Sequence, residues 1–98
     1  MKAKIWQVLP YGHRRAMSVD VIKNLIQEDI DTTIIRQLIR DLIFKDEKLI
    51  ASNNNGFFKI RNRSELNQYV GSLYSRAKNI LKRADKLLEL WDKQFEKA

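Results

Sequence analysis

Residues 31–60 read DTTIIRQLIRDLIFKDEKLIASNNNGFFKI, and this stretch decides the fold. Asp31 is a good N-cap, and the apolar residues after it recur at helical spacing, which predicts a helix from Asp31 to about Lys45. The apolar stripe of this helix comprises Ile35, Leu38, Ile39 and Leu42. Two short β-prone runs follow, at 49–51 and 57–60, with the polar residues SNNNG between them. Because Asn-Gly favours positive φ, we expect a β-hairpin with a polar tip.

The residues before this stretch predict two shorter helices. A helix over residues 2–9 ends at Pro10, because the residue before a proline is pushed out of the α region. Ser18 can cap a second helix from Val19 to about Ile26. Between the two helices lie a basic loop, YGHRR, and Ala16-Met17, which is compatible with a very short strand.

The residues after the hairpin predict one long helix, which begins at about residue 62 or 64 and runs to Glu96. Apolar residues recur there in alternating steps of four and three, which is a heptad pattern over more than three repeats. The residues of this seam are Leu66, Val70, Leu73, Ala77, Ile80, Ala84, Leu87 and Trp91. Beside the seam lie Tyr74, Leu81, Leu88 and Phe95, which widen the apolar face.

The order of these elements defines the expected fold class, which is mainly α with a small β-hairpin. Three short helices followed by a hairpin are typical of a winged helix-turn-helix domain. In that domain the second and third helices form the helix-turn-helix and the hairpin is the wing. We therefore expect a winged-helix domain over residues 1–61, followed by a long C-terminal helix over residues 62–98.

The composition favours a binding protein over an enzyme. The 98 residues include 19 Lys and Arg against 12 Asp and Glu, which gives a net charge of +7 and favours an anionic partner such as nucleic acid. Without Cys and with one His, the chain offers no thiolate or polyhistidine metal site and little for acid–base catalysis, so we expect no enzymatic activity, cofactor or metal. It also has neither a secretory signal nor an apolar run near the roughly 18 residues that a spanning helix needs. We expect a cytoplasmic protein that does not bind membranes.

Several short segments also carry a family resemblance: 9–12 (LPYG), 16–18 (AMS), 35–42 (IRQLIRDL) and 56–58 (GFF), followed by the heptad helix. In these segments the chain resembles the small winged-helix proteins of bacteriophages and related mobile elements. The resemblance implies sequence-specific binding of double-stranded DNA, in transcriptional control or replication-origin recognition, within a bacterial host. The chain departs from the family pattern at residues 44–48, FKDEK, where a glycine is usual.

The third helix carries the candidate base-reading residues on the face opposite its apolar stripe. They are Thr33, Arg36, Gln37 and Arg40. Arg can bond guanine bidentately, Gln can bond adenine, and Thr can contact phosphate or a thymine methyl group. Candidates for contacts with the DNA backbone come from the loop and the wing: Arg14, Arg15, Lys48, Asn54, Asn55, Lys59 and Arg61. A solvated helix face and an exposed turn would have the same composition, so the position of the helix before a hairpin is what favours DNA.

The long helix is expected to need a partner. As a helix, residues 64–97 span roughly 50 Å, whereas a 60-residue domain is only about 25–30 Å across. The apolar face therefore extends beyond the domain that could cover it, and we expect a homodimer. The expected interface comprises Leu73, Ala77, Ile80, Ala84, Leu87 and Trp91. The alternatives are that the helix folds back or docks on another protein. In the latter case the chain would be a winged-helix interaction module that binds or inhibits a host protein.

Overall fold

The computed structural model describes residues 1–96, and its elements follow the expected order. These are α1 (Lys2–Val8), the 3-10 helix η1 (His13–Arg15), α2 (Val19–Ile26), α3 (Thr32–Phe44), β1 (Ile50–Asn53), β2 (Gly56–Lys59) and α4 (Arg63–Phe95). The predicted fold class is confirmed, since a mainly helical chain with one small hairpin ends in a long helix. The chain divides into two compact units, Met1–Leu66 and the residues from Asn67 onward.

Local sequence signals set the helix ends of the first unit. The Ser18 side chain accepts a hydrogen bond from the Val21 N–H at 3.3 Å, and the Asp31 carboxylate accepts one from the Thr33 N–H at 2.9 Å. Both predicted N-caps are therefore confirmed. Leu9, which precedes Pro10, has extended backbone and ends α1, as the proline predicts.

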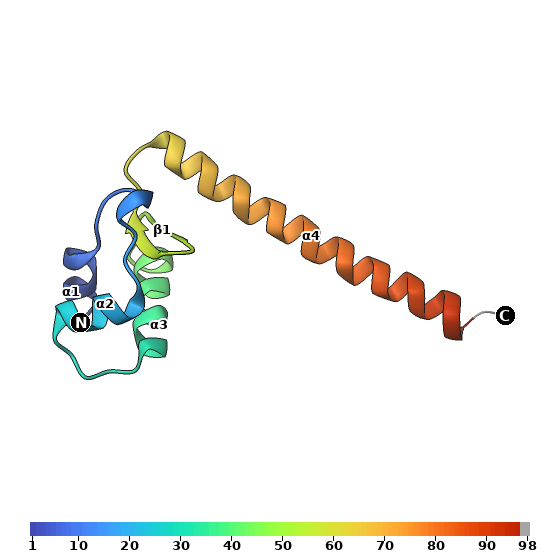
Figure 1. Ribbon diagram of the computed structural model, residues 1–98, viewed down its shortest axis with the longest axis horizontal. Helices are drawn as coiled ribbons and strands as arrows, with labels where there is room; N and C mark the ends of the chain where they lie inside the picture. The colour runs from blue at the N-terminus through green and yellow to red at the C-terminus, as the bar shows by residue number, and fades with distance from the viewer. Residues whose placement is uncertain (97–98) are drawn as a thin grey trace. The chain divides into compact units, whose positions relative to one another are not determined.

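The core of the first unit lies between α1, α2 and α3, which Figure 1 shows grouped beside the hairpin. Ile5, Ile22, Ile35 and Ile39 are its largest fully buried side chains. The predicted stripe of α3 faces this core, because Ile35, Ile39 and Leu42 are buried and Leu38 is half-buried against them. Burying this stripe leaves the opposite face of α3 toward solvent.

Strand β2 is paired on both sides. β1 pairs with it in antiparallel register, with Ile50 opposite Lys59. On the other side Met17 and Phe57 exchange two backbone hydrogen bonds of 2.8 Å, so the short strand at residues 16–17 is a single bridge. This approach requires glycine at position 56: its φ is +137°, and a Cβ there would lie 2.1 Å from the Met17 carbonyl oxygen.

The hairpin turn is shorter than predicted. Ser52, Asn53 and Gly56 belong to the strands, so Asn54 and Asn55 alone form the turn. The reason is local, because the Asn53 side chain accepts a hydrogen bond from the Asn55 N–H at 2.8 Å and so closes a tight polar turn.

The chain turns after α3 within residues 44–48, the segment that lacks the expected glycine, and Glu47 lies in this turn. Its φ is 58°, in the left-handed region that glycine adopts more easily. Just beyond it, the Lys48 N–H donates to the Leu42 carbonyl at 2.9 Å and satisfies one of the last carbonyls of α3. The departure from the pattern therefore leaves the turn in place with a strained residue in it.

The apolar stripe of α4, defined as the seam and flanking residues named above, is exposed over most of its length. Among the predicted interface residues Leu73, Ile80, Leu87 and Trp91 are exposed, and Ala77 and Ala84 lie between them on the same face. The rings of Trp91 and Phe95 contact each other, with centroids 4.6 Å apart. None of the helices within residues 1–96 is long and apolar enough to cross a membrane.

Candidate nucleic-acid interface

The four residues predicted to read bases lie together on the outer face of α3. Thr33, Arg36, Gln37 and Arg40 are all exposed, as expected for the face opposite the buried stripe. They line a shallow depression of about 380 Å³, whose apolar part is formed by Ile39 and Ile43 of α3 and by Phe57 of β2. Hydrogen-bonding side chains and an apolar contact surface therefore meet between α3 and β2.

Sequence reasoning missed Phe44, the last residue of α3. The guanidinium of Arg40 lies over its ring, with the Arg40 Cζ 5.3 Å from the centroid, and Phe44 is 72% exposed. The signal was available, because residues four apart lie on the same helix face and Arg stacks on aromatic rings. This stacking restricts the conformations of the Arg40 side chain on the exposed face of α3.

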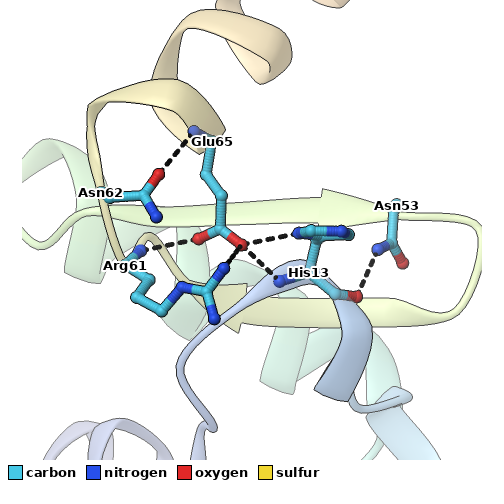
Figure 2. A network of polar contacts seen from close by, with 5 residues as sticks. All are labelled: His13, Asn53, Arg61, Asn62 and Glu65. Carbon is cyan, nitrogen blue, oxygen red and sulfur yellow. Dashed lines mark hydrogen bonds and ion pairs between the residues drawn. The ribbon is translucent and has the colours of Figure 1, made fainter.

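Four of the other candidate contacts lie on the hairpin turn and on η1. Asn54 and Asn55 are exposed at the hairpin turn, and Arg14 and Arg15 are exposed on η1. The loop predicted at residues 11–15 thus includes a short helix, which the buried Glu65 of α4 holds in place (Figure 2).

Glu65 connects three segments of the first unit. Its Oε2 accepts hydrogen bonds from the His13 backbone N–H at 2.9 Å and from His13 Nδ1 at 2.7 Å. Its Oε1 accepts one from the Arg61 N–H at 2.8 Å. Asn53 of β1 completes the network, because its Nδ2 donates to the His13 carbonyl at 2.9 Å (Figure 2). The basic turn, the hairpin and the first turn of α4 are thereby fixed together.

The hydrogen bonds to Glu65 keep its carboxylate ionised. The His13 backbone N–H, then the His13 ring and then the Arg61 N–H lower the pKa of Glu65 from 4.5 to about 2. An ionised carboxylate only accepts hydrogen bonds, so Nδ1 of His13 carries the proton. Sequence reasoning missed this residue because its partner lies 52 residues away.

Lys59, one of the predicted contacts with the DNA backbone, is buried. Its residue is only 7% exposed, and its Nζ lies over the rings of Trp6 at 4.2 Å and Tyr11 at 5.0 Å. Burial and the nearby charge of Lys48 lower the pKa of Lys59. Lys59 therefore takes part in the packing of β2 against α1, which leaves little of its side chain accessible to a phosphate.

The remaining two cations are partly engaged within the chain. Lys48 is half-buried, with its Nζ 5.0 Å from the Trp6 ring centroid. Arg61 is exposed, and its Nη2 lies 3.8 Å from Glu65 Oε2. Among these candidates, Arg14 and Arg15 of η1 and the asparagines of the turn are thus the most exposed groups for contact with an anion.

Comparisons of the chain with models of protein families, with curated proteins and with solved structures each find no match.

Proposed function

We propose that the protein binds double-stranded DNA sequence-specifically through α3 and catalyses no reaction. One observation carries this proposal: Thr33, Arg36, Gln37 and Arg40 gather on the exposed face of a helix whose opposite face is buried in the core. The major groove admits an α-helix, and these side-chain types form the common contacts with base edges.

Contacts with phosphates would supply most of the affinity. The wing turn, with Asn54 and Asn55, and the anchored η1, with Arg14 and Arg15, offer amide and guanidinium groups to the DNA backbone. The net charge of +7 favours association with a polyanion. The Glu65 network supports this role, because a fixed basic turn loses less conformational freedom on binding than a mobile one.

The resemblance to phage winged-helix proteins suggests the biological task. We propose transcriptional control or recognition of a replication origin, carried out in the cytoplasm of a bacterial host. Either task needs specific binding without catalysis.

A salt titration of binding to random duplex DNA tests whether DNA is the ligand. If one site neutralises about four phosphates, the slope of log affinity against log salt should be about −3 to −4. Failure to bind any duplex of a broad library at about 50 mM salt would overturn the proposal.

Selection of bound sequences by the Arg36→Ala and Arg40→Ala variants tests whether α3 is the reader. Each variant should lose about 1–3 kcal/mol of binding free energy and relax the preference at one base position. Lys82→Ala on α4 is the matched control, because it removes a positive charge from the second unit outside its apolar stripe. If both α3 variants keep the affinity and preference of the unaltered protein while folded, another surface reads the DNA.

A second candidate function is a winged-helix module that binds or inhibits a host protein. The exposed apolar stripe of α4 favours it, since large apolar patches are typical of interaction surfaces. The salt titration separates the two candidates, because this module needs no duplex DNA.

A further inference from the structure

The apolar stripe of α4 is symmetric about the midpoint between Ile80 and Leu81. Each stripe residue before the midpoint has a stripe residue at the same distance after it. The pairs are Ile80 with Leu81, Ala77 with Ala84, Tyr74 with Leu87, Leu73 with Leu88, Val70 with Trp91, and Leu66 with Phe95. A helix with this pattern presents the same spacing of apolar positions when it is read in either direction.

The stripe is also the largest uncovered apolar feature of the second unit in the described residues. Ile80 is 62% exposed and Leu87 is 61% exposed, and both lie near the middle of the stripe. Since burial of apolar surface is favourable by about 25 cal/mol per Å², a partner that covers this face gains substantial free energy. The symmetric spacing of the stripe favours a second copy of the same helix as that partner.

We infer that two copies of the chain pair through α4 in antiparallel orientation, with a two-fold axis beside Ile80 and Leu81. This inference concerns α4 and goes beyond the DNA binding proposed for α3. A two-fold interface uses the same patch on both subunits, and in its antiparallel form the mirrored spacing sets each stripe residue opposite a stripe residue of the second copy.

Side-chain size favours the antiparallel orientation. In the centre of the pair, Ala77 lies opposite Ala84 of the second copy, and small residues there allow the two backbones to approach closely. Toward each end, Val70 lies opposite Trp91 of the second copy. A parallel pair would instead place Trp91 opposite Trp91 and Val70 opposite Val70, so the spacing between the helices would be uneven from one end to the other.

The charges beside the stripe contribute a smaller preference. In the antiparallel pair Lys78 lies two residues, or about 3 Å along the axis, from Asp85 of the second copy. The opposed helix dipoles also favour this orientation. On the other edge Arg76 approaches Arg83 of the second copy, so size matching decides the orientation more than charge does.

Cross-linking through single introduced cysteines tests the orientation, and the native chain contains no Cys that would interfere. In the antiparallel pair the two copies of position 81 lie side by side, so Leu81→Cys should cross-link to itself on oxidation or with a short thiol-specific reagent. The two copies of position 70 lie 21 residues, or about 32 Å, apart along the axis, far beyond the roughly 7 Å between Cα atoms that a disulfide spans. Val70→Cys and Trp91→Cys should therefore each fail alone and cross-link when mixed.

Lys82→Cys is the matched control, because it lies near the same axis but outside the apolar stripe, and it should remain uncross-linked. Equilibrium sedimentation of the full chain should show dimers, and replacing Ile80 and Leu87 together by Asp should give folded monomers. Self-cross-linking of Val70→Cys would overturn the orientation. A monomer at tens of micromolar, or an assembly larger than two, would overturn the pair itself. DNA binding is measured separately, so its failure would leave these outcomes unchanged.

Discussion

The two units of the chain use the same kinds of apolar residue in opposite ways. Met1–Leu66 buries its isoleucines between α1, α2 and α3, whereas α4 leaves isoleucine, leucine and tryptophan exposed from Leu73 to Phe95. Helical periodicity predicts both faces equally well, since it registers only which residues share a side. Periodicity does not show whether another part of the chain covers an apolar face. Within the described residues, the helices of the first unit cover one another's apolar faces, and the stripe of α4 stays exposed.

The largest effect is expected when the same substitution, isoleucine to alanine, is made in each of the two units. Ile39→Ala should destabilise the first unit by about 3–4 kcal/mol, because it removes a buried side chain and leaves a cavity. Ile80→Ala should change the unfolding free energy of that unit by less than about 0.5 kcal/mol. Urea unfolding followed by the amide signals of Met1–Leu66 measures both. Equal losses would show that the two units do not differ in this way.

Two glycines should respond in opposite directions. Gly56→Ala should cost about 2–3 kcal/mol, because a Cβ would collide with the Met17 backbone at a positive φ. Gly71→Ala should stabilise α4 by about 0.5–1 kcal/mol, since Gly71 lies in an open helix position. Thermal unfolding, monitored separately for each unit, measures the change in stability that each of the two substitutions causes. A neutral Gly56→Ala would contradict the close approach of β2 to Met17.

The stability of the first unit should depend on pH through Glu65. Its folded pKa of about 2 lies below the 4.5 of an unperturbed glutamate, so its stabilising effect is complete above about pH 4.5 and is lost as the pH falls toward 2. Glu65→Gln should lower the Tm at pH 7 and flatten the dependence of Tm on pH between 4.5 and 2. Glu89→Gln, at an exposed ion pair of α4, should leave that dependence unchanged. If Glu65→Gln left the dependence of Tm on pH unchanged, the Glu65 carboxylate would not be the cause of that dependence.

The smallest effect again has opposite signs in the two units. Glu47→Gly should stabilise the first unit by about 0.5–1 kcal/mol, because glycine adopts the left-handed backbone of this position without strain. Lys82→Gly should destabilise α4 by about 1 kcal/mol, because glycine is a poor helix former. Differential scanning calorimetry of the two variants measures both changes in stability. A loss in Glu47→Gly would mean that the side chain contributes more than the strain costs.

The features predicted from the sequence are those set by neighbouring residues. Ser18 and Asp31 cap helices through hydrogen bonds to residues two or three positions away, and Pro10 acts on the residue before it. Contacts between distant segments were not predicted. Lys59 appeared to be a surface cation, but Trp6 and Tyr11 cover it from segments more than 40 residues earlier in the chain. The sequence analysis missed Glu65 for the same reason, since its partner His13 lies 52 residues earlier in the chain.

The pairing of β2 on both sides also bears on how the purified protein would aggregate. Because β1 and the segment ending at Met17 occupy both flanks of β2, these two form the outer edges. β1 is four residues long and ends at a polar turn, and the segment ending at Met17 pairs only through isolated bridges. Long, flat and apolar edges are the ones that template strand addition and amyloid growth. Association in a concentrated sample of the folded protein should therefore be helical in character, and a cross-β signature would indicate that the first unit had unfolded.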